Sequence, residues 1–364
     1  MQIVAALVGL VLVVGVLRDS FETIILPRRV SGVRLSKVFY QLSWKPWRAV
    51  ARRMPLGDRR ETFLSVYGPL SLLILLVIWG VALISGFALL LWAANFDGGL
   101  SAVGHLYVSR TTFTTLGIGD FVPHTDLARL VTVVEAGTGF GFLAVVISYL
   151  PILYQSFAGR ETAISMLDEW AGSPPSAGAL FRRAVKYGAR DELQPLLVRW
   201  EEWTADLLES HLSYQVLSYF RSQHENQSWL AALTAIMDLA SVSQAVRSEG
   251  NIWPAKRLYA IGRHALGDLS QVLRAAPRFD APSRVSEEDL KTIHDELIQV
   301  GFEGDFDTFR DRVNTLRKGY EPYAFALSEE LLMELPPWLA PADGRKDNWE
   351  TTAWEGSAPG ESLR

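Results

Sequence analysis

One apolar segment constrains this fold more than any other feature: no charged residue occurs in the 35 positions from Thr62 to Phe96. A helix needs about 20 apolar residues to cross the hydrocarbon core of a bilayer. We therefore expect a membrane helix within Tyr67–Ala93. A second apolar run extends from about Leu127 to Tyr154, and a third, Ile3–Leu17, starts the chain. The chain is predicted to be a multi-pass membrane protein.

The first apolar run has two interpretations. Its length suits the hydrophobic region of a cleaved signal peptide. However, it lacks a basic region before it and an obvious small-x-small cleavage site, and it ends in Arg18-Asp19-Ser20. These features favour a retained, short membrane helix over residues 1–17, and the signal peptide stays as the alternative.

The segment 18–61 predicts the orientation, because it holds 11 Lys and Arg residues against four acids. The positive-inside rule places such a loop in the cytoplasm. The amino terminus is then outside and the carboxyl-terminal part is cytoplasmic. Within this loop, Leu35–Arg53 mixes aromatic and basic residues and is typical of a segment in the inner membrane interface. A plain solvated basic loop is the alternative.

Between the two longer apolar segments, residues 111–122 read Thr-Thr-Phe-Thr-Thr-Leu-Gly-Ile-Gly-Asp-Phe-Val. Glycines allow backbone angles that a Cβ forbids. With those angles, consecutive carbonyls can all face one axis. Four such strands around an axis would replace the hydration shell of an ion with rings of oxygen atoms. A turn in a soluble domain would not be bracketed by two membrane-length segments.

This segment resembles the pore loop of the potassium channels, whose filters usually read Thr-Val-Gly-Tyr-Gly-Asp. The resemblance covers about residues 62–156. The positions that match the filter are Thr115, Leu116, Gly117, Ile118, Gly119 and Asp120. It implies that K⁺ binds at the backbone carbonyls of the first four, with the Thr115 hydroxyl at the innermost site.

Two departures from the family pattern bear on the filter. Ile118 stands where the family usually has Tyr, so no phenol is available behind the filter. Tyr107 lies where many relatives carry Trp, and it is expected to meet the aliphatic side chain of Ile118. Potassium preference remains the expectation, because the backbone chemistry is unchanged. The stiffness of the filter stays open.

Four residues near the filter carry further expectations. By the resemblance, Gly139 lies about where the inner helix of the family has its glycine hinge, and Pro151 removes a helix hydrogen bond and can kink that helix. Close helix packing is the alternative reason for the glycine. Arg110 and Glu135 both fall at membrane depth, where an unpaired charge is expensive. They are expected to form a buried ion pair; the alternative is that Arg110 snorkels and Glu135 is protonated.

The carboxyl-terminal part reads as a helical, acidic region. The chain holds 35 basic and 40 acidic residues, and residues 1–156 hold 13 and 8 of these, which leaves 22 and 32, or a net charge of −10. This charge argues against nucleic-acid binding. Apolar residues recur at helical spacing, for example in Glu192–Arg221. No Gly-x-Gly-x-x-Gly follows a strand pattern, and the histidines show no metal-ligand spacing. Four of them, His211, His224, His264 and His294, are read as ordinary helix residues.

The absence of cysteine from the whole chain excludes disulfides, cysteine nucleophiles and thiolate metal sites. No organic cofactor is expected; potassium is expected only as the permeant ion. The proline- and glycine-rich tail from Pro336 is expected to be disordered. Any regulator of the helical region is unidentified.

Together these observations predict an all-α membrane protein with a potassium-channel-type pore. The expected parts are an N-terminal membrane helix (1–17), a basic linker (18–61), a pore domain (62–156), a helical cytoplasmic domain (157–335) and a disordered tail (336–364). Since one chain supplies one filter strand, four copies are needed to close the ion cage.

The predicted function is therefore a homotetrameric potassium channel of a prokaryotic plasma membrane. It is not expected to be an enzyme. The alternatives are a non-selective or non-conducting channel relative whose helical domain binds a partner, and a membrane-anchored enzyme. The latter lacks any assembled nucleophile, metal or phosphate-loop signature.

Overall fold

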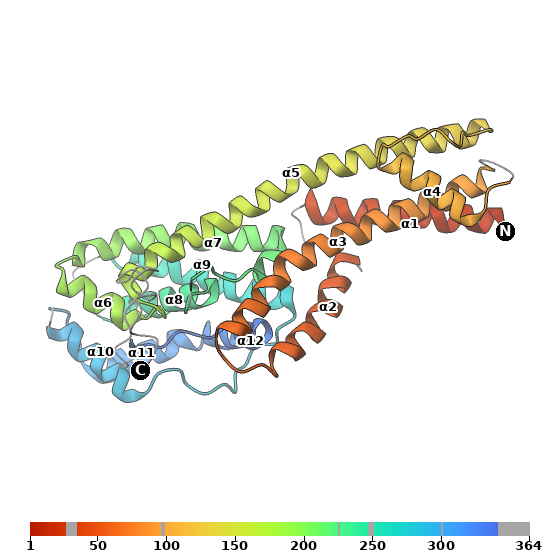
Figure 1. The fold of residues 1–364 in the computed structure, drawn as a ribbon. Helices are drawn as coiled ribbons and strands as arrows, with labels where there is room; N and C mark the ends of the chain where they lie inside the picture. The colour runs from red at the N-terminus through yellow and green to blue at the C-terminus, as the bar shows by residue number, and fades with distance from the viewer. Residues whose placement is uncertain (27–34, 96–98, 225, 247–250, 300, 341–364) are drawn as a thin grey trace, which may run out of the picture. The chain divides into compact units, whose positions relative to one another are not determined.

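The structure is a computed structural model that describes residues 1–26, 35–95, 99–224, 226–246, 251–299 and 301–340. It divides into two compact units, Met1–Gln155 and Ser156–Arg364. In the described residues, every secondary-structure element of several residues is a helix (Figure 1). Together with three helices long and apolar enough to cross a bilayer, this confirms the predicted class, an all-α membrane protein.

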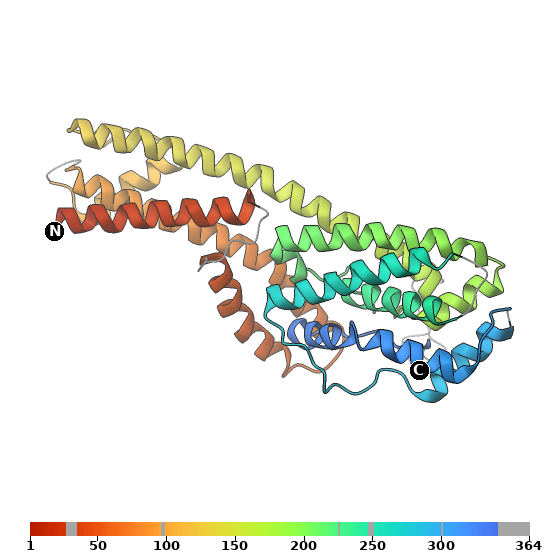
Figure 2. The same cartoon turned by 180° about the vertical axis from the view of Figure 1, so that it is seen from behind.

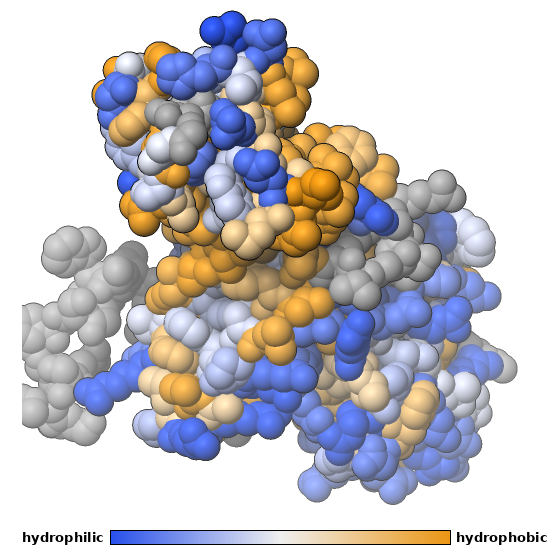
Figure 3. Space-filling view, turned by 90° about the vertical axis from the view of Figure 1, so that its right-hand side faces the viewer, coloured by the Kyte–Doolittle hydropathy of each residue, from blue (hydrophilic) through white to orange (hydrophobic). Residues whose placement is uncertain are grey.

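The described residues of the first unit form four helices and the beginning of a fifth. They are α1 (Gln2–Ile24), α2 (Leu35–Ala51), α3 (Asp58–Ala93), α4 (Ala102–Phe113) and α5 (Asp126–Ala171), the last of which continues into the second unit. The candidate membrane-spanning helices are α1, α3 and α5. Apolar residues gather on the flanks of this unit in Figure 3, and exposed aliphatic side chains such as Val77 and Val133 belong to these helices.

Helices α1 and α3 pack closely through two glycines. A Cβ on Gly9 would lie 2.7 Å from the carbonyl oxygen of Gly86, and a Cβ on Gly86 would lie 2.8 Å from Cγ2 of Val13. Small residues let two membrane helices approach in this way. The N-terminal run thus packs along α3 as an integral part of the first unit.

Helix α1 is longer than predicted, because the charges after Leu17 do not end it. Arg18 forms an i, i+4 ion pair with Glu22 at 2.8 Å, which suits a continuing helix. The carboxylate of Asp19 turns inward and accepts a hydrogen bond from the indole of Trp79 at 2.9 Å. It also accepts the Ser36 backbone N–H at the start of α2 at 3.1 Å. The helix thus continues seven residues beyond the predicted boundary at residue 17.

The predicted basic linker contains α2, whose aromatic side chains face the first part of α3. Trp44 lies 4.7 Å from the Tyr67 ring, and Trp47 stacks on Phe63 at 4.4 Å between ring centroids. Helix α3 itself begins at Asp58, well before the apolar segment, because acidic residues in a first turn favour a helix N-terminus. The part of the linker at residues 27–34 lies outside the described residues.

In the second unit, helices surround one central buried helix. After the end of α5 come α6 (Ala177–Lys186), α7 (Leu193–Ser213), α8 (Trp229–Ala245), α9 (Trp253–Leu273), α10 (Glu287–Gln299), α11 (Phe306–Arg317) and α12 (Glu321–Leu331), with short 3₁₀ turns η1 (Arg190–Glu192) and η2 (Gln215–Tyr219). Every residue of α8 from Trp229 to Val242 is buried. A helix that is apolar on all sides belongs in such a core. Helices α7, α9, α11 and α12 pack around it (Figure 2).

The predicted disordered tail begins too early. Trp338 is only 1% exposed, and the guanidinium carbons of Arg284 and Arg317 lie 5.8 and 5.5 Å from its ring centroid. Its carbonyl accepts the Gly178 N–H at 3.0 Å. Prolines prevent a helix here, but they do not prevent burial of a large aromatic ring. Residues 341–364 of the predicted tail lie outside the described part.

Candidate functional site

Helix α4 forms the support of the candidate site. Its N-cap residue, Ser101, accepts the Gly104 N–H at 3.2 Å, which satisfies one of the free donors at a helix start. On its side, the Ser109 hydroxyl donates to the Ile84 carbonyl of α3 at 2.7 Å. Val108 joins Leu91 in a small buried cluster between the helices. Helix α4 is thereby fixed against α3.

The predicted filter segment starts directly at the C-terminal end of α4. The Thr111 carbonyl accepts two hydrogen bonds, from the Leu116 N–H at 2.9 Å and from the Gly117 N–H at 3.2 Å. The Thr115 N–H donates to the Thr112 carbonyl at 3.0 Å. The last carbonyls of a helix have no partner within the helix, so these bonds both satisfy them and set the direction of the segment that follows.

The sign of φ alternates along this segment. Thr115, Gly117 and Gly119 have φ of +59°, +56° and +80°, whereas Leu116 and Ile118 are not among the residues with positive φ. In an ordinary strand, successive residues face opposite sides. When left- and right-handed angles alternate, backbone groups of the same kind point to one side instead. In an anion-binding nest, this alternation brings the N–H groups together. The geometry is suited to a row of carbonyls along one line.

Glycine meets this requirement without cost at two of the three positions. At Thr115 the left-handed angle costs on the order of 1–2 kcal/mol. A non-glycine residue held in this region is uncommon and is found where the surrounding structure fixes it. The hydrogen bonds to the end of α4 supply that constraint.

The filter segment is uncovered in a single chain. The side chains of Leu116 and Ile118 are 67% and 60% exposed, and a Cβ on Gly117 would meet no atom within 4 Å. Large apolar side chains in a backbone-fixed segment are not expected to face water. The single chain therefore leaves this segment open to its surroundings.

Tyr107 lies against the end of the segment. Its phenol is close enough to the Asp120 carboxylate to interact with it, and its ring packs edge-on against Phe121 with 6.3 Å between centroids. The expected contact of Tyr107 with Ile118 stays a prediction. Asp120, the last position of the motif, thus has a partner on α4.

Gly139 lies where α5 meets the end of α4. A Cβ on this residue would lie 2.0 Å from the carbonyl oxygen of Phe113, so the two backbones touch there. This contact accounts for the glycine by packing. Helix α5 continues without interruption through both Gly139 and Pro151. Their role as a hinge remains a prediction.

The expected ion pair between Arg110 and Glu135 is not formed. Glu135 is fully buried, and one of its oxygens is bonded to the Ser109 hydroxyl. Its Oε2 has no hydrogen-bond partner among the described residues. Arg110 is exposed. The physical reason is rotation: adjacent residues point about 100° apart around a helix, so the face of α4 toward Glu135 carries Ser109 and not its neighbour.

The end of α5 is anchored within the second unit by Arg160, which the sequence gave no reason to single out. Its guanidinium donates to the carbonyls of Leu217 and Phe220 at 3.0 Å each. It also lies 3.2 Å from Nε2 of His211. Since Nδ1 of this histidine lies 2.8 Å from the Leu207 carbonyl and can donate to it, Nε2 is the acceptor. Burial and the neighbouring Arg160 charge hold the pKa of His211 well below its ordinary value.

Part of this chain resembles known proteins in sequence. Residues 71–156 match a family described as "Ion channel". An uncharacterized membrane protein of Bacillus subtilis (strain 168), YdjJ, is 27% identical over 209 residues, or 54% of this chain and 57% of that protein. The chain thus spans just over half the length of this relative. No solved structure matches.

The chain accordingly contains an ion-channel domain, and it is a membrane protein. The resemblance to the potassium-channel pore-loop family is confirmed by this match over residues 71–156. The matched segment comprises most of α3, all of α4 with the filter segment, and the first part of α5. Ion conduction is the activity that the description of this family indicates.

Proposed function

We propose that this protein is a potassium-selective channel in which K⁺ passes through the Thr115–Asp120 segment. The observation that carries the proposal is the alternating backbone between Thr115 and Gly119, directly after a helix that is fixed against α3. Rings of carbonyl oxygens in this arrangement would replace the hydration shell of the ion. The K⁺ ligands would be the backbone carbonyls of Thr115, Leu116, Gly117 and Ile118.

The channel would be a homotetramer. The uncovered filter segment of one chain supports this, because an ion cage needs oxygen atoms on all sides. Identical subunits usually close such a ring by rotational symmetry. Native mass spectrometry in detergent tests the assembly: a tetramer is expected, and monomers or dimers alone would contradict it.

The protein would lie in the plasma membrane of a prokaryote, with the basic segment 18–61 in the cytoplasm. The filter would then face outward and the second unit would be cytoplasmic, where it could serve assembly or bind a regulator. Cysteine substitution at the exposed Leu56 of the basic segment or at Ser101, followed by labelling of intact cells with a membrane-impermeant thiol reagent, tests this orientation. Labelling of the Ser101 position alone is expected.

A non-selective channel is the second candidate, and Ile118 favours it. With an aliphatic side chain at this position, the filter lacks the phenol that the family usually has behind the ion sites. Reversal potentials in mixed K⁺ and Na⁺ separate the two candidates. A reversal potential that shifts with the K⁺ gradient alone supports selectivity. A reversal potential that shifts equally with the K⁺ and Na⁺ gradients supports the second candidate.

Single-channel recording of the purified protein in lipid bilayers is the direct test of conduction. Gly119→Ala is expected to abolish the K⁺ current, because alanine at φ of +80° is strained. Gly80→Ala, at a helical glycine of α3 with no atom within 4 Å of an added Cβ, is the matched control and should conduct normally. Normal K⁺ currents from Gly119→Ala would refute the filter assignment.

A further inference from the structure

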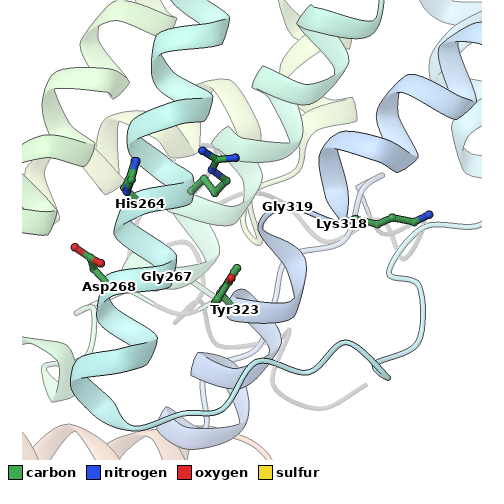
Figure 4. A pocket seen from close by; sticks show the side chains of 7 residues that line it. His264, Gly267, Asp268, Lys318, Gly319 and Tyr323 are labelled. Carbon is green, nitrogen blue, oxygen red and sulfur yellow. The ribbon is translucent and has the colours of Figure 1, made fainter.

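A pocket in the second unit lies between α9 and the turn that joins α11 to α12 (Figure 4). Its volume is about 360 Å³, at the lower end of the range of about 300–1,000 Å³ for small-molecule sites. One wall is the face of α9 that includes Gly267 and Asp268. The other wall includes Lys318 and Tyr323. Both walls lie within the unit that starts at Ser156.

Gly267 contributes only backbone atoms to the lining of the pocket. Glycine inside a helix is less favourable than alanine by about 1 kcal/mol, so it usually has a packing or functional reason. Packing is not the reason here, because a Cβ on Gly267 would meet no atom within 4 Å. The nearby Gly262 differs, since its Cβ would lie 2.2 Å from the Met237 sulfur. The absence of a side chain at Gly267 keeps the pocket open.

Two basic residues border the pocket, within an acidic region. Arg263 and Lys318 line it, and neither has a hydrogen bond or ion pair from its side chain within the described ranges. Other arginines nearby are engaged: Arg278 pairs with Glu329, and Arg317 with Glu321. Cations without a carboxylate partner, on a unit rich in acids, are available to an anionic ligand.

The remaining lining residues can recognise the rest of such a ligand. In Figure 4, Asp268 lies on one side of Gly267 and Tyr323 on the other. Both are half-buried. The carboxylate of Asp268 accepts hydrogen bonds from hydroxyl or amino groups, and the ring of Tyr323 offers an apolar face beside its edge contact with Phe279.

We propose that this pocket binds a small organic phosphate monoester, with the phosphate at Arg263 and Lys318 and a hydroxyl-bearing or aromatic part lying across Gly267. The Lys318 side chain extends outward on the far side of the turn (Figure 4), so it closes onto the phosphate by changing rotamer. Binding at this site does not depend on conduction by the filter.

Calorimetric titration of the full-length protein in detergent tests the site with three probes: AMP, glucose 6-phosphate and inorganic phosphate. We expect saturable binding of at least one organic phosphate, one per chain, tighter than that of inorganic phosphate. Arg263→Gln should weaken it by about tenfold to a hundredfold, the equivalent of losing a charged hydrogen bond. Gly267→Leu should abolish it by filling the pocket.

Two control variants distinguish a loss of ligand binding in the pocket from a general loss of folding. Arg312→Gln removes an exposed arginine of α11 that does not line the pocket, and Ala260→Leu adds the same side chain elsewhere on the exposed surface of α9. Both should bind as the unaltered protein does. The proposal is overturned if none of the three probes binds, if inorganic phosphate binds as tightly as the organic phosphates, or if Arg263→Gln leaves the affinity unchanged.

Discussion

Gly139→Ala distinguishes the packing role of this glycine from a hinge role. In the structure an added Cβ would lie 2.0 Å from the Phe113 carbonyl oxygen. Real Cβ atoms essentially never come within 3.0 Å of such a neighbour, so helix α5 would have to move away from α4 by roughly 1 Å. Overpacking of this kind costs typically about 1–3 kcal/mol. The contact partner is backbone, which cannot rotate away, so we expect the upper part of that range.

The opposing effect is helix propensity, since alanine favours a helix over glycine by about 1 kcal/mol. Gly137→Ala measures this effect by itself, because a Cβ on Gly137 meets no atom within 4 Å in the chain. The net expectation is destabilisation by about 1–2 kcal/mol for Gly139→Ala and no loss of stability for Gly137→Ala. The two variants should therefore differ in sign.

The measurement is thermal unfolding in detergent, followed by tryptophan fluorescence, with K⁺ flux from liposomes recorded in parallel. A packing role predicts lower stability together with reduced flux, because Phe113 immediately precedes the filter segment. A hinge role predicts reduced flux at unchanged stability. Equal stability of the two alanine variants would refute the reasoning from the Phe113 contact.

Three further changes probe Ser109, Asp238 and Tyr107. Ser109→Ala removes the only hydrogen-bond partner that the described residues offer Glu135, and should destabilise the protein in detergent by about 1–3 kcal/mol; no change in unfolding temperature would contradict this. Burial raises the pKa of Asp238 to about 6, above its unfolded value of about 3.9, so stability is lost as pH rises from about 4 through 6. The Asp238→Asn variant should not lose stability over this pH range. Parallel pH profiles of stability for the variant and the unaltered protein would exclude Asp238 as the cause. Tyr107→Phe removes the phenol next to Asp120 but keeps the ring, and should lower the K⁺ over Na⁺ permeability ratio in bilayer recordings; an unchanged ratio would show that the phenol does not stiffen the proposed filter.

The class of fold could be predicted from the sequence because its signals are local. Charge-free length predicts a membrane helix whatever surrounds it, and the Thr-Leu-Gly-Ile-Gly-Asp motif requires special backbone angles by itself. The structure bears out these angles at Gly117 and Gly119. It adds Thr115, where a β-branched side chain gave no sign of a left-handed angle. Its angle accompanies the bonds from the Leu116 and Gly117 N–H groups to the Thr111 carbonyl, which end helix α4 locally.

Contacts between helices were predictable only in part, because they depend on how each helix is rotated. Arg110 and Glu135 have opposite charges at similar depth, and the sequence therefore suggested a pair. On the face of α4 that packs toward Glu135, the residue present is Ser109 and not its neighbour Arg110. Likewise, the inward turn of Asp19 depends on Trp79, which is 60 residues away. Charge patterns alone predict neither partner.

The proposed filter segment combines two features whose effects would oppose each other. Ile118 stands where the family usually has a phenol that braces the middle of the segment from behind. Tyr107 instead places a phenol next to Asp120, with its ring against Phe121. This contact acts on the residue after the last glycine, at the opposite end of the segment from the bonds to Thr111. If the segment conducts K⁺ as we propose, we expect its stiffness to depend on the contacts at these two ends more than on bonds at its centre.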